Sequence, residues 1–424
     1  MNPELRRNLW LEATPARAMM TIVVLFLLVL AASLAAGRDE AADSCLWMAA
    51  ALGVLWGPRL AAQSLLGEIA ANTWDMQRAG ALSGWQMAIG KLAGSTAIAW
   101  FGIALCWAAA FGLGGSRGPA DWRDLVLLAW LAQAGALFAA LVLAAAARGG
   151  RAIDGFAAQI AGIAFALGVR SMVAITFDSA DRFWGAPSAP WMAPAAMLAM
   201  ALLATGGCWW RMADALQAPS GLFVWPLFLA CIGFLAGGSA YGQLPWEAAA
   251  FAAILPIAWL ALLVDPKPPV ALRVWMARPD LAGTPAWLLG FGFLLVLAVW
   301  MAVAGSTAEL RGARDLLPSW MEGLPWRIAA IPVLLFFLRD VALFHLIAWG
   351  GVPGRGLVAA LVYAAVLYGL LPTILSAAEG GSLLWLLLPV PGAPLVQSLA
   401  APLLQCLALG FLAARRLQAL TPGG

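Results

Sequence analysis

Long apolar runs alternate with short polar stretches along almost the whole chain. A helix needs about 20 mostly apolar residues to cross a bilayer, and runs of that length recur from one end to the other. We therefore expect about twelve spanning helices. Residues 221–238 form the weakest of them, and a separate apolar run, 383–389, is expected to be re-entrant or interfacial. The expected spans are residues 20–37, 45–65, 92–113, 124–147, 156–176, 191–209, 221–238, 247–264, 286–305, 327–347, 356–375 and 393–414.

Composition supports a membrane protein and excludes several other classes. Of the 424 residues, 63% are hydrophobic and only 11% are charged, whereas soluble domains carry about 25% charged residues. The formal net charge of +3 is too small to indicate nucleic-acid binding. The five cysteines are widely spaced and form no CxxC pair, which argues against a disulfide framework or a metal site. The predicted fold class is an all-α, polytopic helical membrane protein.

A short amphipathic helix is predicted before the first span. The Asn-Pro-Glu sequence that starts at residue 2 is typical of a helix N-terminus. The residues after it place Leu5, Leu9 and Trp10 on one side of the helix and Arg6 and Arg7 on the other. Such a helix is expected to lie in the headgroup region. A signal peptide that ends near residues 34–36 is the competing interpretation, and the rapid return to a second span disfavours it.

The distribution of Lys and Arg gives an orientation. If twelve spans alternate in direction, both termini lie on one side, and about two thirds of the Lys and Arg residues fall on that side. Positive residues accumulate on the cytoplasmic side of membrane proteins. We therefore expect both termini to be cytoplasmic.

The most informative polar stretch is residues 67–91, between the second and third expected spans. It is too polar to lie in hydrocarbon, so it forms a loop or a surface helix on one membrane face. Thr73 followed by Asp75 is typical of a helix start, and Gly80 of a helix end. We expect a short cytoplasmic helix here, with an apolar side at Trp74 and a charged side at Asp75.

The order of motifs in this stretch resembles the cytoplasmic loop of ABC-2 type transporter permease subunits. The layout of the first half, an amphipathic helix and six spans, is similar to that family as well. Asn72 stands where Gly is usual and Gly84 where Pro is usual, but Asn tolerates the left-handed backbone that a turn needs. The motifs are the acidic Glu68, Asn-Thr-Trp-Asp at 72–75, Leu-Ser-x-Trp at 82–85 and Ile-Gly-Lys at 89–91.

The resemblance implies the permease subunit of an ATP-driven transporter, an exporter of a bacterial inner membrane. In that family this loop is a coupling helix that docks on a separate ATP-binding subunit, which holds the ATP and Mg²⁺. A solvated connector between two spans is the competing interpretation of the loop. Residues 1–215 would be the permease half, with a coupling loop at 64–91, whereas 216–424 is a second membrane half that does not align. Whether the chain pairs with a second copy or with another permease stays open. The implied coupling residues are Glu68, Thr73, Asp75, Arg78, Ser83, Trp85 and Lys91.

We expect no ATPase domain within this chain. A P-loop requires GxxxxGK[ST] after a strand, whereas Gly90 and Lys91 are followed by Leu92 and open a span. The chain is therefore expected to bind no cofactor and to be a transporter subunit rather than an enzyme. One group of charged residues is expected on the side of the membrane opposite the termini, and we call it the far-side group. A catalytic role for it is disfavoured, because alternating charges on a short helix are typical of a solvated face. That group consists of Glu309, Arg311, Arg314, Asp315 and Glu322.

Polar residues inside the expected spans bear on the energy source. With these boundaries Asp154, Asp265 and Asp340 are assigned to span ends, so the span centres are expected to contain no acid, which weighs against an ion-coupled secondary carrier. His345, the only histidine, is expected to form a structural hydrogen bond. A non-transporting membrane scaffold or assembly factor is the main alternative function. Interhelical hydrogen bonds are expected from Gln133, Gln159, Gln397 and Gln405.

Overall fold

The computed structural model describes residues 2–80, 82–114, 118–146, 155–177, 182–218, 223–241, 245–265, 267–280, 283–304, 326–349, 356–377, 380–388 and 395–420. These residues are almost entirely helical, which confirms the all-α expectation. The strands among them are β1 (Arg182–Phe183) and β2 (Ala186–Pro187), which pair antiparallel. By their contacts the residues divide into two compact units.

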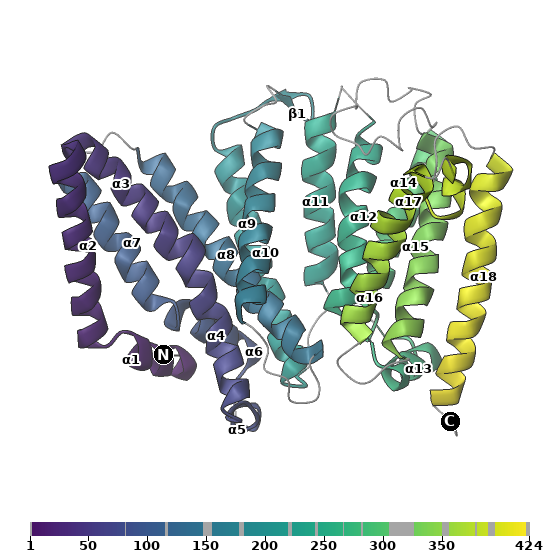
Figure 1. Cartoon of the computed structure of the whole chain (residues 1–424), viewed down its shortest axis with the longest axis horizontal. Helices are drawn as coiled ribbons and strands as arrows, with labels where there is room; N and C mark the ends of the chain where they lie inside the picture. The colour runs from purple at the N-terminus through teal and green to yellow at the C-terminus, as the bar shows by residue number, and fades with distance from the viewer. Residues whose placement is uncertain are drawn as a thin grey trace. The chain divides into compact units, whose positions relative to one another are not determined.

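The first unit comprises Met1–Ser179 and Ser188–Val224, shown from purple to blue in Figure 1. Its N-terminal helix α1 leads through a turn into the long helix α2. α3, the π-helical η1 and α4 then form one continuous helix, and the π-helical η2 leads into α7 with a bend of 45°. The elements are α1 (Pro3–Glu12), α2 (Pro15–Ala36), α3 (Arg38–Ala50), η1 (Ala51–Trp56), α4 (Gly57–Ala70), α5 (Trp74–Arg78), α6 (Gly84–Ile89), η2 (Gly90–Gly94), α7 (Ala97–Gly112), α8 (Pro119–Ala146), α9 (Gly155–Phe177) and α10 (Met192–Ala215).

The core of this unit lies between α4, α6, α8 and α10. Leu65, Met87, Leu137 and Met212, one from each helix, are completely buried. Where α8 crosses α9 the helices approach closely, because a Cβ atom on Gly135 would lie only 3.0 Å from a backbone atom of α9. The run of small residues in α8 therefore serves close helix packing, as in many membrane bundles.

The second unit comprises Ala180–Pro187 and Trp225–Gly424. Its helices α12, α14, α15 and α18 pack in that order. A 3-10 helix, η5, contacts both α17 and α18. The helices are α11 (Val224–Ala240), α12 (Trp246–Val264), α13 (Pro269–Ala277), α14 (Ala286–Ala304), α15 (Trp326–Ala348), α16 (Gly356–Ala365), η4 (Val366–Leu370), α17 (Leu371–Ala377), η5 (Gly380–Leu386) and α18 (Leu395–Leu420).

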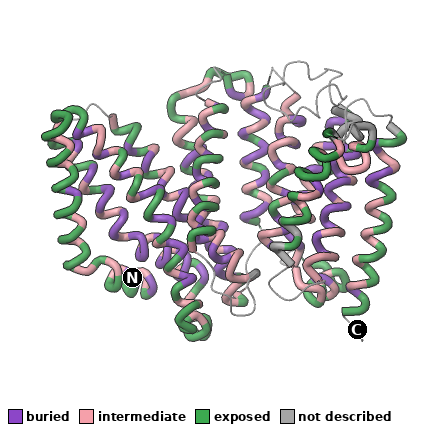
Figure 2. The backbone as a smooth tube through the Cα atoms, viewed as in Figure 1, coloured by how far each residue is buried: buried purple, intermediate pink, exposed green. Residues whose placement is uncertain are grey.

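The described residues contain nine helices that are long and apolar enough to cross a membrane, or ten if the bent pair before and within α7 is one span. The chain is therefore a multi-pass membrane protein, but twelve spans are not confirmed. The two remaining expected spans correspond to the shorter apolar helices Val224–Ala240 and Val362–Leu375. Most of α2 is exposed, as Figure 2 shows, and its mean hydropathy of 2.7 suits contact with lipid.

Candidate functional site

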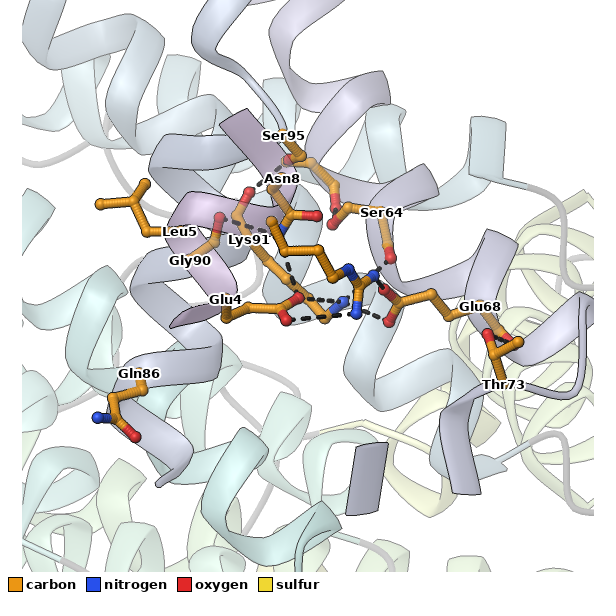
Figure 3. Close-up of polar contacts among 12 residues, drawn as sticks. Glu4, Leu5, Asn8, Ser64, Glu68, Thr73, Gln86, Gly90, Lys91 and Ser95 are labelled. Atoms are coloured by element: carbon orange, nitrogen blue, oxygen red, sulfur yellow. Dashed lines mark hydrogen bonds and ion pairs between the residues drawn. The ribbon is translucent and has the colours of Figure 1, made fainter. Parts of the chain in front are cut away.

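A completely buried lysine lies at the start of the third span. Lys91, in η2, has a side chain that is 0% exposed, and its ammonium is within 3.3 Å of the Glu4 carboxylate. The same ammonium forms an ion pair with Glu68 and donates a hydrogen bond of 3.2 Å to the carbonyl of Ser64. Figure 3 shows that these groups come from α1, α4 and η2. An isolated buried charge is costly, so Lys91 requires both carboxylates.

The partners of Lys91 are themselves connected by the N-terminal helix. Arg7 forms ion pairs with Glu68 and, at 3.4 Å, with Glu4. Asn8 donates from Nδ2 to Glu4 at 3.0 Å and to the carbonyl of Gly90 at 3.2 Å. Two carboxylates thus face two cations, which leaves the group neutral as a whole. We call this group the clamp, and it consists of Glu4, Arg7, Asn8, Ser64, Glu68 and Lys91.

Two glycines let α1 approach η2 closely. A Cβ atom on Gly90 would lie 2.5 Å from Cγ of Glu4, and one on Gly94 would lie 2.7 Å from Cβ of Asn8. Nothing larger than hydrogen fits at either position while α1 stays docked. A hydrogen bond of 2.7 Å from Asn2 Nδ2 to the carbonyl of Gln86 holds the beginning of the helix.

The docked face of α1 differs from the one that its sequence suggests. Glu4 and Asn8 are the buried residues of the helix, whereas Trp10 is 85% exposed. The side with Glu4 and Asn8 therefore packs on the protein, and Trp10 points outward. An outward apolar face is what a helix at a membrane interface needs.

The rest of segment 67–91 projects from the helix bundle as a turn that is held by hydrogen bonds and an ion pair. Asn72 adopts a φ of 56°, which confirms the left-handed turn expected there. The hydroxyl of Thr73 donates to the carbonyl of Glu68 at 3.2 Å, and α5 follows directly. At its tip Asp75, 88% exposed, pairs with Arg78 at 3.5 Å. Figure 1 shows α5 at one extreme end of the first unit.

The segment re-enters the bundle through a capped helix. The Ser83 hydroxyl accepts from the Gln86 amide and the Gln86 side chain accepts from the Ser83 amide, a reciprocal capping box. Gly84, where the family motif has Pro, packs tightly, since a Cβ atom there would lie 3.0 Å from the backbone of Ala213. Trp85, next along the helix, is 50% exposed.

The structure therefore sorts the expected coupling residues into three groups. Glu68 and Lys91 meet in the clamp, Thr73 and Ser83 shape the turns, and Asp75, Arg78 and Trp85 lie at the surface. Sequence reasoning missed Glu4, Arg7 and Asn8 as partners of the segment. The four-residue spacing of Glu4 and Asn8, which places both on one helix face, was the available signal.

The second unit contains a buried ion pair that corrects one expectation. Arg339 and Asp340 are 3% and 4% exposed and lie in the middle of the candidate span Ala330–Ala348, not at a span end. The guanidinium donates to Asp340 at 2.8 and 2.9 Å, to Tyr368 at 2.8 Å, to the carbonyl of Leu387 at 3.1 Å and to Gln405 at 3.2 Å. All five of its N–H groups are thereby satisfied.

The carboxylate of Asp340 is satisfied as completely. One oxygen accepts from Arg339 and the other from Trp259, at 3.0 Å, and from Tyr368. Because the carbonyl of Leu387 reaches Arg339 at mid-span, the segment that contains η5 enters the bundle from one end. This favours the re-entrant alternative for the apolar run 383–389, of which residues 383–388 are described.

Other polar residues of the spans have structural roles. Nδ1 of His345 donates to the carbonyl of Val341 at 2.7 Å, and the ring packs edge-on against Trp287 and Trp349. Gln405 donates to the carbonyl of Leu386 at 2.8 Å, whereas the side chain of Gln397 is exposed. Asp154 and the far-side group Glu309, Arg311, Arg314, Asp315 and Glu322 lie outside the described residues.

Comparison with family models, with curated proteins and with solved structures finds no match to this chain. Among the described residues, no three His, Cys, Asp or Glu side chains lie together in a way that could hold a metal ion. The described carboxylates of the clamp face an ammonium and a guanidinium instead. The ion pairs of this site therefore hold the base of a surface turn in place.

Proposed function

We propose that this chain is the membrane-spanning subunit of an ATP-driven, ABC-2-like transporter, energised by a separate cytoplasmic ATP-binding subunit. One observation carries the proposal. The clamp joins α1, α4 and η2 through the ion pairs of the buried Lys91 and the partly exposed Arg7, so the exposed turn at α5 stands on a rigid base. Segment 67–91 has the motif order of the family's coupling loop, and the clamp supplies the stiffness that such a loop requires.

The arrangement suits force transmission into the membrane. α5 follows α4 after a three-residue turn, and η2 continues into α7. A partner that pushes on α5 therefore acts directly on the ends of two long helices. The exposed tip offers Met76, 75% exposed, beside the Asp75–Arg78 pair, and methionine and arginine are enriched at protein interfaces. In this proposal the tip faces the cytoplasm of a bacterial cell, both termini lie on the same side, and transport is outward.

A crosslinking experiment tests the partner. A photo-reactive amino acid at position 75 is expected to capture an ATP-binding cassette subunit in native membranes, identified by mass spectrometry. The control is the same amino acid at Phe111, 81% exposed near the other end of α7, which should not capture it. If neither position, or both equally, captures an ATPase that is present in the cells, segment 67–91 is not the coupling surface.

Charge reversal separates a transporter from a scaffold. In the copurified complex, Asp75→Arg is expected to lower substrate-stimulated ATPase activity severalfold, and Arg78→Asp to do the same. The double reversal restores an ion pair at the tip with the two charges exchanged. It is expected to recover part of the activity only if the partner requires an intact ion pair there and not a particular charge at each position. A membrane scaffold or assembly factor that transports nothing would leave the ATPase rate unchanged in all three variants.

The Arg339–Asp340 pair favours an ion-coupled secondary carrier as a second candidate. Ionisable residues within spans often mark ion pathways, and Asp340 lies at mid-span. This candidate predicts that collapse of the proton gradient at constant ATP abolishes transport, and that Asp340→Asn makes any residual transport insensitive to the gradient. The ATP-driven proposal predicts transport that continues without the gradient and stops on ATP depletion.

A further inference from the structure

An open groove of about 510 Å³ separates α7 from α8 in the first unit. α7 packs mainly against α2 and α3, and α8 mainly against α4, α9 and α10. The two helices are therefore each held by other neighbours, which leaves space between them. We call this space the tryptophan groove, and its main lining residues are Trp100, Ile103, Trp107, Trp122, Arg123 and Val126.

The groove has a closed apolar floor and an open side. Ile103 and Trp122 are 4% and 7% exposed and form the floor, whereas Trp107 and Val126 are 53% and 40% exposed and form the walls. At one end the ring of Trp100 contacts that of Trp130, with centroids 5.9 Å apart. The other end opens near the start of α8 at Pro119.

The groove runs along the spans rather than across them. Its lining covers residues 100–107 of α7 and 119–127 of α8, which at 1.5 Å per residue is about 10–12 Å of helix. One leaflet contributes about half of a hydrocarbon core that is about 30 Å thick. The groove therefore covers most of one leaflet's depth. It starts at the ends of the two spans, at the membrane interface, where tryptophan side chains are enriched.

Charges of both signs lie at the mouth of the groove. Nε and Nη2 of Arg123 donate to one oxygen of Asp124 at 3.0 and 2.9 Å, and both side chains are partly exposed. Among the described residues at this end of the groove, one guanidinium thus stands beside one carboxylate. A phosphate is complementary to the guanidinium and an ammonium to the carboxylate of Asp124, whereas a purely anionic headgroup offers that carboxylate no cationic partner.

We propose that the tryptophan groove binds one phospholipid molecule whose headgroup carries both a phosphate and a primary ammonium. An acyl chain lies along the apolar floor between α7 and α8 and ends against the Trp100–Trp130 contact. The phosphate contacts Arg123, and the ammonium contacts Asp124. This site is independent of segment 67–91, so it does not rest on the proposed transport function.

Lipid add-back to the purified, delipidated full chain tests the site by native mass spectrometry. The probes are palmitoyl-oleoyl phosphatidylethanolamine and the phosphatidylglycerol with the same acyl chains. Ala104→Trp fills the groove, since Ala104 belongs to its lining. Ala108→Trp places the same side chain on an exposed part of α7 outside that lining. We expect one retained phosphatidylethanolamine, about tenfold weaker binding in Ala104→Trp, equivalent to 1.4 kcal/mol, and unchanged binding in Ala108→Trp.

The headgroup is tested separately. Asp124→Asn is expected to reduce the preference for phosphatidylethanolamine over phosphatidylglycerol severalfold without abolishing retention. Equal binding of both lipids by the native chain, or equal effects of the two tryptophan substitutions, would overturn the proposal. If Ala104→Trp does not yield a monodisperse protein, photo-crosslinkers at Trp107 and Ala108 replace it. Lipid capture at 107 but not at 108 supports the site, and equal capture refutes it.

Discussion

Replacement of Lys91 by methionine measures how strongly the clamp holds α1. The substitution keeps an unbranched side chain of similar size but leaves the carboxylates of Glu4 and Glu68, 2% and 12% exposed, without the ammonium. Removal of one partner from a buried ion pair costs about 3–5 kcal/mol. Because Arg7 contacts both carboxylates and remains in place, we expect the lower end, about 3 kcal/mol of unfolding free energy.

The assay is reversible unfolding of the purified protein by sodium dodecyl sulfate in mixed micelles, together with hydrogen exchange of α1. Arg17→Met is the matched control, because it breaks a more exposed pair with Glu12, at 53% and 29% exposure, which contributes no more than about 1 kcal/mol. We expect Lys91→Met to lose far more stability than the control and to lose exchange protection in α1 first. Equal losses in the two variants would refute the burial argument.

A triple variant without the lysine and without both carboxylates isolates the electrostatic cause. Glu4→Gln and Glu68→Gln, added to Lys91→Met, remove both uncompensated carboxylates while Arg7, 41% exposed, stays hydrated. Replacement of an entire buried ionic group is often neutral or stabilising. The triple variant is therefore expected to recover most of the loss. If it is no more stable than Lys91→Met alone, the lysine acts through its shape and not through its charge.

Three further substitutions and one control are tested with the same unfolding measurement. Gly90→Ala forces a Cβ atom to 2.5 Å from Glu4 and should cost about 1–3 kcal/mol, whereas Gly67→Ala, with no atom within 4 Å, should be neutral or stabilising; similar effects at both sites would contradict the close approach of α1. Asp340→Asn leaves a buried guanidinium without its counter-charge and should cost about 3–5 kcal/mol, so an unchanged stability would mean that the pair is not buried in the membrane. Ser83→Ala removes one half of the capping box and should cost about 0.5–2 kcal/mol, with increased hydrogen exchange confined to α6 and η2.

Local signals in the sequence were sufficient for the long spanning helices and for the turn at Asn72. Apolar runs identify the spans because each must cover the hydrocarbon thickness by itself. Asn72, at a φ of 56°, occupies the left-handed region that asparagine tolerates, and α5 begins directly after Thr73 and ends before Gly80. These features depend only on neighbouring residues, so a single sequence contains them.

The clamp could not be predicted, because its ion pairs join residues that are far apart in the chain. Nothing local indicates that Glu4 faces Lys91, and the apolar residues of α1 predicted a membrane-facing helix without any contact to segment 67–91. Arg339 and Asp340 were misplaced for a different reason, because Asp340 was assigned to a span end. They are adjacent and of opposite charge, and the apolar residues around them keep the mean hydropathy of their span at 2.0. A window average cannot distinguish a neutralised pair from an apolar stretch.

The polar side chains of the spans share a role that the structure makes clear. A π-helical segment does not make the regular i to i−4 hydrogen bonds of an α-helix, and no water in hydrocarbon can replace them. In η1 the carbonyls of Gly53 and Leu55 accept hydrogen bonds from Gln133 at 3.2 Å and from Gln159 at 2.7 Å. Polar groups from other helices therefore stabilise this irregular backbone.

The same relation holds in η2, where the carbonyl of Gly90 accepts from Asn8 of α1 at 3.2 Å. In η4 the carbonyl of Gly369 accepts instead from the Thr373 hydroxyl, four residues further along the same helical run, at 2.7 Å. η2 and η4 also carry Lys91 and Tyr368, members of the two buried ionic groups. Irregular backbone creates free polar groups in the bundle, and these in turn make buried polar side chains tolerable. Isolated polar residues in this apolar chain are therefore better indicators of helix irregularity than of a substrate pathway.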